Sequence, residues 1–400
     1  MWVAPAPTAR EARSPMQLSS APMQPRQATR PLEYIAGLDG MRAIAIFGVM
    51  LFHFTAPFFA SFSRSDSWIL KGLAAVASVG WVGVDVFFVI SGYLIARILD
   101  SNPNGPTSDY GRFIKRRAWR LLPAYVFCLA LFTIAALAIK PDSKVLANSH
   151  LAWTLLTNIE IGFGDRTALG DDTFSLVHFW TLAVEWHFYL LFPWVARFAG
   201  STTRAAWTLV AAAVITRCAL FLAGASDNAV YAFTVGRLDG FAFGCLVASP
   251  ALRRFRPHAG QVAWAGTLGF IALLAGLAAA DQPQKTLPWL QTWGYSALAL
   301  TAAMALFGMI HAPGRAVAAM ECRFLTAAGR ASYSLYVWHF VFFPCLRNAT
   351  LHSGGPVVQF LLAAALGTAV TAILGAFSYR YVEARFRRQG TSAAVALNAR

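Results

Sequence analysis

Residues 38–59 read LDGMRAIAIFGVMLFHFTAPFF, an apolar stretch with Asp39 and Arg42 at its start and His53 near its middle. An α-helix turns about 100° per residue, so the steps from Arg42 to His53 return to within roughly 20° of the same face. Asp39 falls within roughly 40° of that face. The rise from Arg42 to His53 is about 16 Å, about half the thickness of a hydrocarbon core. We therefore predict a membrane-spanning helix with one polar stripe.

Two interpretations of this stripe are open. Arg42 can be an interfacial anchor and His53 a buried histidine bonded to a neighbouring helix, or both can belong to a functional site. Ionisable groups deep in a membrane are costly and concentrate at functional sites, which favours the second interpretation.

The composition is that of a membrane protein. The 400 residues are 57% hydrophobic and 13% charged, with a mean hydropathy of +0.53, whereas soluble chains carry about 25% charged residues. Only helices or closed barrels satisfy the backbone in lipid, and the apolar runs here are continuous rather than alternating. We predict an all-α integral membrane protein with about ten transmembrane helices, at 41–61, 73–97, 120–139, 176–198, 205–224, 229–249, 261–280, 289–311, 329–346 and 357–378.

The net charge of +15 follows from topology. With the N-terminus in the cytoplasm, most Lys and Arg residues fall on the cytoplasmic side, as the positive-inside rule requires. The basic segments GRFIKRRAWR (111–120), ALRRFRPH (251–258) and SYRYVEARFRR (378–388) all lie on that side. We therefore expect both termini in the cytoplasm, the lipid bilayer as a partner, and no nucleic-acid partner.

The terminal segments and the cysteines further define the predicted domain organisation. Residues 1–33 are rich in Pro, Ala, Ser and Arg and lack the apolar core of a signal peptide, so we predict a disordered cytoplasmic tail. Residues 383–400 are predicted to form a second cytoplasmic tail, which leaves 34–382 as the transmembrane domain. The five cysteines are far apart and form no CxxC pair, so neither a disulfide framework nor a metal site is expected.

The longest outward loop covers residues 140–175. Its LAWTLLTNIEIGF core (151–163) is too short and polar to span, which leaves a re-entrant or an interfacial segment. Asp165, Asp171 and Asp172 make the loop mildly acidic. A lid over an acceptor site and a solvated loop both fit this sequence.

Several spans carry polar residues at helical spacing. Arg117 and Arg120 share a helix face, which suits bidentate phosphate recognition, although a positive-inside loop is the alternative. His178 and Glu185 also share a face, and the alternative there is a structural ion pair with Arg217 or Arg237. No HExxH motif occurs, so a zinc protease is excluded.

Two further segments have features of a pocket or of close packing. Ser332, Tyr336 and His339 lie on one side of the ninth span, which suits a pocket, while an aromatic belt at the membrane surface is the alternative. Glycines recur at four-residue spacing in the sixth span, a pattern that lets helices approach closely. Ser91 and Gly92 can loosen the second span near its inner half, and ordinary close packing at the glycine is the alternative.

Taken together, these segments resemble the bacterial membrane acyltransferase-3 family, which O-acylates surface and secreted glycans and some small molecules. The resemblance covers about residues 34–382 and rests on motifs in a fixed order: LDGMRAIAIFGVMLFHF, GVDVFFVISGYLI, RRAWRLLPAY, FWTLAVEWHFYLLFPW, GRLDGFAFGCLVA, GRASYSLYVWHF and SYRYVEARFR.

The resemblance implies ten transmembrane helices in the bacterial inner membrane and an acyl-CoA donor, usually acetyl-CoA, on the cytoplasmic side. It also implies a glycan or lipid-linked glycan acceptor reached from the other side. His53 and Arg42 would be essential, with Arg117, Arg120 and Glu185 in support.

Three departures from the family stand out. His187 replaces a usual glutamine, the proline that commonly follows the terminal glutamate is missing in VEARF, and the extra helix and esterase-like domain of some relatives are not seen. The chain would then act alone.

The predicted mechanism places His53 as general base or as a transient acyl carrier, with Asp39 or Glu185 orienting its imidazole. Arg42, Arg117 and Arg120 are expected to bind the phosphates of the co-substrate. No permanently bound cofactor and no metal are expected. The predicted substrate pocket comprises Ser91, Tyr93, Trp180, His187, Arg237, Tyr336 and His339.

Two other functions remain open. A transporter of glycan or lipid precursors would use buried charges as a relay, but neither an inverted repeat nor paired broken helices are apparent in the sequence. A scaffold subunit of an export complex would tolerate the loss of His53.

Overall fold

The computed structural model describes residues 1–2, 34–280 and 284–386. Across this part of the chain the regular structure is helical, and the one extended pairing is an isolated bridge between Gly170 and Ser175. Seven helical stretches within it are long and apolar enough to cross a membrane: Leu38–Ser63, Trp68–Asp100, Tyr110–Ile139, Thr202–Leu222, Pro250–Ala278, Leu290–His311 and Pro356–Phe386. The prediction of a helical membrane protein is confirmed, and the count of about ten spans was approximate.

The three remaining predicted spans differ from these seven in two ways. The helix α9 (Trp180–Ala199) is long enough, but its Glu, His and Trp residues make it less apolar. The predicted spans 229–249 and 329–346 are interrupted helices rather than continuous ones. Pro344 explains the second interruption, because its ring would clash with the Phe340 carbonyl in a continuous helix.

The helices follow one another along the chain with short connections. The N-terminal half contains α1 (Leu38–Thr55), α2 (Phe59–Ser63), α3 (Trp68–Ser78), α4 (Gly83–Asp100), α5 (Tyr110–Ile139), α6 (Lys144–Ala147), α7 (His150–Trp153), α8 (Thr157–Phe163), η4 (Val177–Phe179) and α9. The C-terminal half contains α10 (Thr202–Leu222), α11 (Asp227–Ala232), η5 (Val235–Arg237), α12 (Leu238–Ala248), η6 (Pro250–His258), α13 (Ala259–Ala278), η8 (Leu290–Gly294), α14 (Tyr295–His311), α15 (Arg315–Met320), α16 (Arg323–Arg330), α17 (Ser332–Trp338), α18 (Phe343–Asn348), α19 (Pro356–Phe377) and η9 (Ser378–Glu383). Four shorter turns, η1 (Ala56–Phe58), η2 (Gly80–Val82), η3 (Arg166–Leu169) and η7 (Gln284–Thr286), complete the set.

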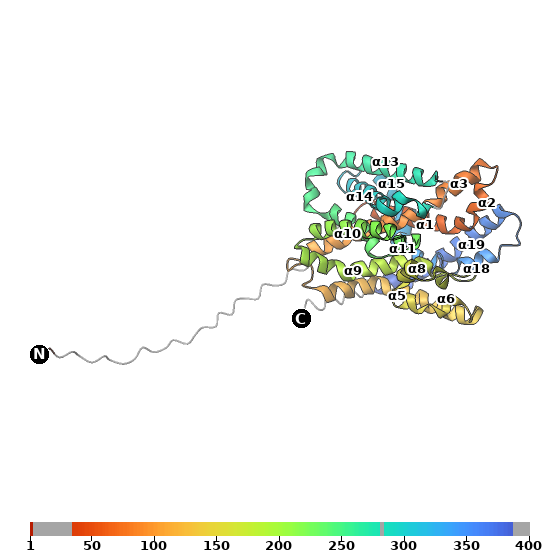
Figure 1. The fold of residues 1–400 in the computed structure, drawn as a ribbon, viewed down its shortest axis with the longest axis horizontal. Coiled ribbons are helices and arrows are strands. Elements are labelled where there is room, and N and C mark those ends of the chain that lie inside the picture. Colours follow the sequence, from red (N-terminus) through yellow and green to blue (C-terminus); the bar gives the residue numbers. More distant parts are fainter. Residues whose placement is uncertain (3–33, 281–283, 387–400) are drawn as a thin grey trace.

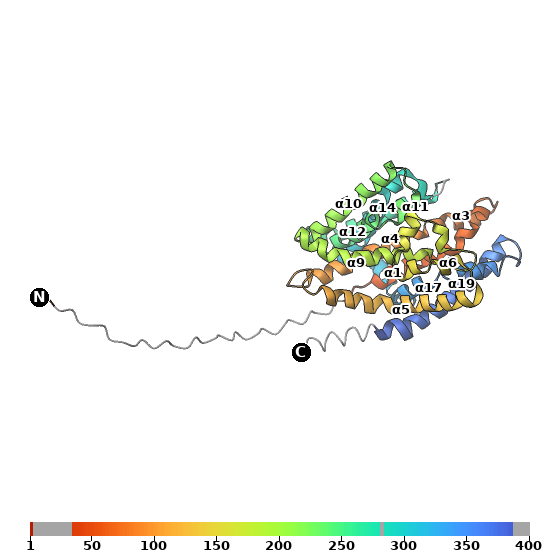
Figure 2. The same ribbon diagram turned by 60° about the horizontal axis from the view of Figure 1, so that its bottom comes forward.

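The long helices run side by side along one direction, with α13 at one edge of the bundle and α5 at the opposite edge (Figures 1 and 2). The helices α4 and α12 pack closely in the interior because glycines face backbone there. A Cβ on Gly92 would lie 1.9 Å from the Phe241 carbonyl oxygen, and one on Gly244 would lie 2.0 Å from that of Val89. The glycine pattern of the sixth span therefore has the close-packing role that the sequence predicted.

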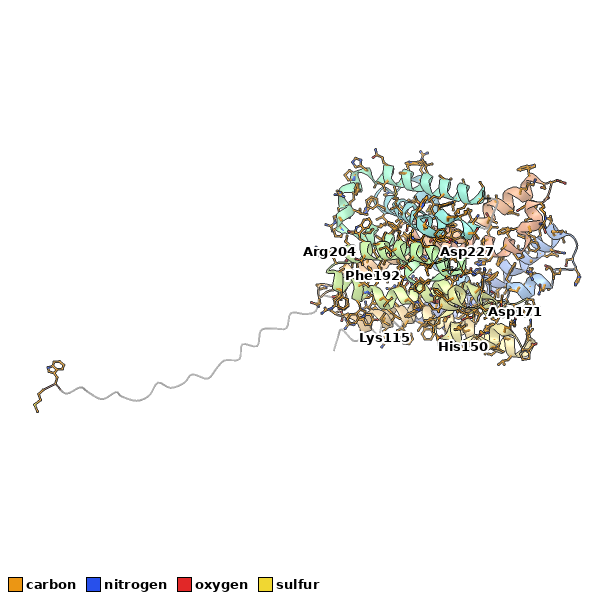
Figure 3. The ribbon with its side chains drawn as sticks, in the orientation of Figure 1. Lys115, His150, Asp171, Phe192, Arg204 and Asp227 are labelled. Atoms are coloured by element: carbon orange, nitrogen blue, oxygen red, sulfur yellow. The ribbon has the colours of Figure 1, made fainter. Side chains whose placement is uncertain are left out.

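Residues near the start and the end of the folded bundle lie close together, because Tyr34 and Ala384 line a common cavity at one end of it. Lys115 and Arg204 lie toward this end in Figure 3, whereas Asp171 lies toward the opposite end. This arrangement agrees with the charge asymmetry of the sequence, and the assignment of this end to the cytoplasm stays a prediction.

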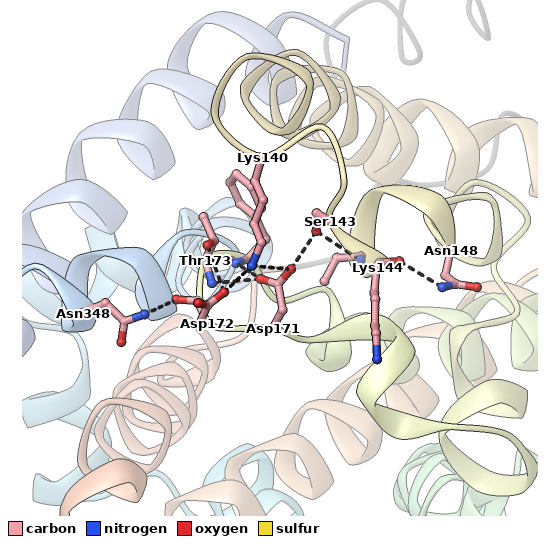
Figure 4. A network of polar contacts seen from close by, with 10 residues as sticks. Lys140, Ser143, Lys144, Asn148, Asp171, Asp172, Thr173 and Asn348 are labelled. Carbon is pink, nitrogen blue, oxygen red and sulfur yellow. Dashed lines mark hydrogen bonds and ion pairs between the residues drawn. The ribbon is translucent and has the colours of Figure 1, made fainter.

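The loop 140–175 is folded and tied down at the far end of the bundle. Lys140 donates to Asp172 at 2.5 Å, and the Asp171 carboxylate accepts from the Ser143 hydroxyl at 2.7 Å (Figure 4). The Asn348 amide donates to the Asp172 carbonyl at 2.6 Å and so attaches the loop to α18. The bond from Lys140 lowers the pKa of Asp172 and raises the pKa of Lys140.

The C-terminal boundary of the fold lies later than predicted. Helical structure continues through residues 383–386, and Glu383, which was assigned to the tail, is buried and accepts a 2.8 Å bond from the Ser334 hydroxyl. The rest of the two predicted tails, 3–33 and 387–400, lies outside the described residues.

Candidate functional site

A cavity of about 610 Å³ opens at the end of the bundle where Tyr34 and Ala384 lie. Its volume lies in the range of about 300–1,000 Å³ that is typical of small-molecule sites. Six of its lining residues were predicted as site residues: Asp39, Arg42, Ser91, Arg120, Glu185 and Tyr336. The cavity therefore joins α1, α4, α5, α9 and α17.

The mouth of the cavity is rich in charged groups. Asp39 lies 3.9 Å from Arg42 and 3.3 Å from Arg330, so the two arginines share one carboxylate. Arg120 lines the same space and forms no ion pair with any residue in the described ranges. Guanidinium groups in such an arrangement are suited to binding phosphate.

The rim of the mouth is held by Glu321. Its carboxylate accepts from the Tyr34 hydroxyl at 2.7 Å and from the Gly37 backbone N–H at 2.5 Å. The bond from Tyr34 to Glu321 raises the pKa of Tyr34. The segment that precedes α1 is thereby fixed beside the mouth.

Deeper in the cavity, Glu185 is the central polar group. Its carboxylate accepts a hydrogen bond from the Ser91 hydroxyl at 2.7 Å and another from the Tyr189 hydroxyl. It pairs with neither Arg217 nor Arg237, so the structural ion pair considered for this residue is not formed. Tyr336 lies at the inner wall, where its hydroxyl meets Thr181 at 2.7 Å and donates to the His178 carbonyl at 3.0 Å.

Behind Tyr336 lies a histidine cluster made of His53 from α1, His178 from η4, and His339, which directly follows α17. His339 Nε2 is 3.1 Å from His53 Nδ1, and the rings of His339 and His178 are 4.9 Å apart. His178 and His339 are only 2% and 1% exposed.

The interruption after α17 explains how this cluster is held. The last carbonyls of a helix have no partner within it. The Tyr336 carbonyl lies 2.6 Å from His339 Nδ1, and the Val337 carbonyl lies 3.2 Å from His178 Nε2. The broken helix therefore supplies two acceptors that orient two buried imidazoles.

His53 does not line the cavity, although Arg42 on the same helix does. The helix α1 is regular from Leu38 to Thr55, so the two residues share a face as predicted. His53 lies further along that face and contacts His339, whose ring lies 5.2 Å from that of the lining residue Tyr336.

The predicted partners of His53 are different in the structure. Asp39 pairs with the arginines of the mouth, and Glu185 accepts from Ser91 and Tyr189. The polar groups within hydrogen-bond distance of the His53 imidazole are the Val49 carbonyl, at 3.0 Å, and His339. Neither carboxylate orients this imidazole here, because each is held elsewhere.

A second group of charges forms a sealed ion-pair cluster made of Asp85, Arg217, Arg237 and Asp239. Arg237 lies 2.6 Å from Asp85, and Arg217 lies 2.9 Å from Asp239. All four side chains are at most 3% exposed. Arg237 also lies over the Tyr295 ring, 4.3 Å from its centre. Arg237, a predicted pocket residue, thus serves as an ion-pair partner and does not line the cavity.

The other predicted site residues also lie outside the cavity lining. His187 lies 2.8 Å from the Thr234 hydroxyl, because two helical steps turn it away from Glu185. Trp180 packs on Tyr231, and Tyr93 accepts from Arg97 at 3.3 Å. Of the pair Arg117 and Arg120, only Arg120 is among the residues that line the cavity.

Sequence reasoning missed several residues of the cavity. Arg330, Tyr333, Tyr379 and Glu383 belong to motifs that were quoted for the family resemblance, yet none was chosen as a site residue. The charge of Arg330 next to the GRASYS motif was the available signal. Nothing in the spacing of the C-terminal motif indicated that it returns to the mouth.

Two interrupted helices that were not apparent in the sequence do exist, and both lie in the C-terminal half of the chain. One interruption lies between α11 and α12 and places Arg237, and the other follows α17 and places His339. The sequence argument against a transporter therefore loses part of its basis.

Within the described residues, no group of three or more His, Cys, Asp or Glu side chains is arranged to hold a metal ion. The five cysteines all lie in this part of the chain and are free thiols.

Comparison with known proteins gives one family. Residues 35–376 match the Acyl_transf_3 family model, described as an acyltransferase domain. The O-acetyltransferase OatA of Staphylococcus aureus is 27% identical over 384 residues, which cover 90% of this chain and 58% of OatA. A putative O-acetyltransferase of the same species is 25% identical over 382 residues, which cover 91% of this chain and 59% of that protein.

The chain thus spans less than two thirds of the length of the curated relatives that it matches. No solved structure matches it.

Proposed function

This chain belongs to the acyltransferase-3 family, and on that premise we propose that it moves an acyl group, in the simplest case acetyl, from acyl-CoA to a hydroxyl of a glycan. The observation that carries this proposal is the order of groups along one path. Arginines lie at the mouth of the cavity, Glu185 and Ser91 lie deeper, and the histidine cluster lies behind Tyr336.

The donor would enter from the mouth. The phosphates of coenzyme A would bind Arg42, Arg120 and Arg330, because guanidinium groups form charge-assisted bonds with phosphate oxygens. The narrow pantetheine arm would then extend inward past Glu185. Since His53 does not line the cavity, the thioester would reach it only after a rearrangement of side chains at the inner wall, where Tyr336 lies.

The transfer itself would use His53 as a general base. Its imidazole takes the proton of the acceptor hydroxyl while the oxygen attacks the thioester carbonyl carbon. The carbon–sulfur bond then breaks, coenzyme A leaves as a thiolate, and the proton held by His53 neutralises it. An acyl group carried briefly on His53 Nε2 is the alternative route. Single-turnover reaction with labelled acyl-CoA and no acceptor separates the two, since only the second leaves label on the protein.

The acceptor would be a glycan exposed on the other side of the membrane. The names of the relatives support an O-acetyl product and do not identify the acceptor. Lipid-linked repeat units, O-antigen and exopolysaccharide are the leading classes, with nodulation-type oligosaccharides and macrolides as alternatives. Mass spectrometry of surface glycans from a deletion strain would identify it by the loss of acetyl groups.

The test of the proposal is the variant His53→Ala, with His53→Gln as a second variant of closer volume. Loss of a general base is expected to reduce turnover by about 10²–10⁴-fold. The melting temperature in detergent should stay close to that of the wild type. Turnover of labelled acetyl-CoA at the wild-type rate in both variants would contradict the proposed role of His53.

A transporter of glycan or lipid precursors is the second candidate, and the two interrupted helices are the observation in its favour. Flux of glycan precursors into liposomes, with no consumption of acetyl-CoA in the presence of any acceptor, would support it. Consumption of acetyl-CoA that depends on an acceptor would exclude a pure transporter, and also a scaffold subunit.

A further inference from the structure

The hydrogen bonds in the histidine cluster determine which ring nitrogen of His339 carries a hydrogen. Its Nδ1 atom lies 2.6 Å from the Tyr336 carbonyl oxygen, which can only accept a hydrogen bond. Nδ1 therefore carries a hydrogen. Among the described residues no carboxylate lies within ion-pair distance of His339, and its side chain is 1% exposed, so the neutral form is favoured. In a neutral imidazole with Nδ1–H, the Nε2 atom is an acceptor.

This tautomer determines that of His53. The Nδ1 atom of His53 lies between two acceptors, the Val49 carbonyl oxygen at 3.0 Å and His339 Nε2 at 3.1 Å. Only an N–H satisfies both contacts, so Nδ1 of His53 carries the hydrogen. The lone pair of His53 is then on Nε2, which has no hydrogen-bond partner within the described ranges.

We propose that His339 is the positioning residue of His53: its Nε2 accepts from His53 Nδ1–H and thereby directs the basic Nε2 of His53 toward the reacting hydroxyl. This inference rests on the proposed function. It makes His339 a residue that acts through His53 rather than a lining residue of the substrate pocket.

The bond between His339 Nδ1 and the Tyr336 carbonyl depends on the interruption of the helix after α17. His339 follows the last residue of α17, where the Tyr336 carbonyl is left without a helical partner. In a continuous helix that carbonyl would accept from a backbone N–H and would leave His339 Nδ1 without this acceptor. The break therefore fixes both the tautomer and the direction of the ring.

His178 provides a matched control within the same cluster. It is as buried as His339 and its ring lies 4.9 Å from that of His339. Its Nε2 contacts the Val337 carbonyl, and it forms no hydrogen bond with His53. The variant His178→Gln keeps a donor near the position of Nε2 and should reduce turnover much less than His339→Asn, because it leaves the bond between His339 and His53 in place.

Three substitutions of His339 separate positioning from packing. Gln places an amide oxygen near the position of Nε2 and can still accept from His53. Asn places its amide near Nδ1, so it keeps the bond to the Tyr336 carbonyl but presents no acceptor to His53. Phe keeps the ring volume and has neither polar atom.

The experiment uses the full chain expressed in a host that lacks its own copy. Membranes receive labelled acetyl-CoA, and the rate of label incorporation into glycan is measured. We expect His339→Asn and His339→Phe to lose about 10²-fold in kcat, the loss typical of a misplaced catalytic group. The KM for acetyl-CoA should be unchanged, and His339→Gln should recover most of the rate.

Two outcomes would overturn the inference. One is wild-type kcat in His339→Asn and His339→Phe while both remain folded. The other is an equal loss in all three variants, Gln included, accompanied by a lower melting temperature, which would indicate packing alone. If His53→Gln also turns over at the wild-type rate, the proposed function fails as well, and the two failures are thereby distinguished.

Discussion

Two groups of opposite charges lie in this bundle in different surroundings. In the sealed ion-pair cluster, Arg237 lies 2.6 Å from Asp85 and both side chains are at most 3% exposed. At the cavity mouth, Arg42 lies 3.9 Å from Asp39 and both side chains are more exposed, at 15% and 14%. Arginine and aspartate thus contact each other closely in the sealed ion-pair cluster, whereas at the mouth the same residue types face the cavity. The close, fully buried pairing is that of a structural ion pair, whereas we propose a binding role for the arginines beside the cavity.

The largest effect on stability is expected when one partner of the sealed ion-pair cluster is removed. Arg237→Met leaves Asp85 buried without its partner and should reduce the free energy of unfolding by about 3–5 kcal/mol. The double variant Asp85→Leu with Arg237→Met should recover much of that loss. Thermal unfolding in detergent measures both.

The matched control is the exposed pair Arg112 and Asp109, 3.4 Å apart and 32% and 42% exposed. Arg112→Ala should change stability by about 0–1 kcal/mol. An Arg237→Met protein that keeps its melting temperature but loses turnover would return Arg237 to the substrate pocket.

The open cavity should respond in the opposite way. Arg120→Gln removes a charged donor that lines it, and a hydrogen bond to a charged group is worth about 1.5–3 kcal/mol. We therefore expect the KM for acyl-CoA to rise about 10- to 150-fold. The stability should change by only about 0.5 kcal/mol.

Lys115→Gln is the control for Arg120→Gln, since Lys115 is an exposed residue of the same helix. If both variants have the same KM, Arg120 does not contact the donor.

The close packing of α4 against α12 depends on glycine. Gly92→Ala would place a Cβ 1.9 Å from the Phe241 carbonyl oxygen, and overpacking of this kind costs about 1–3 kcal/mol. Gly72→Ala, in the exposed helix α3, meets nothing within 4 Å and should be neutral or slightly stabilising. Equal melting temperatures for the two variants would show that α4 and α12 are not in tight contact.

The smallest effect is expected at the exposed pair Lys140 and Asp172. The bond from Lys140 lowers the pKa of Asp172 in the folded state. Its contribution is therefore present above the unfolded pKa and is lost as the pH falls through the folded pKa. Asp172→Asn should lower the melting temperature slightly at neutral pH, and the difference should vanish in acid. A difference that persists in acid would contradict this assignment.

Helical geometry made part of this structure predictable. Because α1 is a regular helix, counting residues was enough to place Arg42 and His53 on one face. Spacing along one helix does not say which other helix is adjacent, so the pairing of Arg237 with Asp85 could not be predicted. The same limit applies to Glu185, whose partner Ser91 is on α4.

The interruption after α17 was partly readable from the sequence, because Pro344 excludes a continuous helix through Phe340. The contacts that this interruption creates could not be predicted from the sequence. Only the tertiary structure brings the Tyr336 carbonyl, His339 and His53 together, and this contact replaced the carboxylate that was expected to orient the imidazole.

The mouth of the cavity has a consequence for how the protein is made. Its lining joins Tyr34, which precedes the first span, to Tyr379 and Ala384, which follow the last one. A ribosome-bound chain that has inserted every helix except α19 therefore lacks part of the lining of this cavity. If the cavity binds acyl-CoA as proposed, a half-made copy in the membrane would not bind it with the full set of contacts.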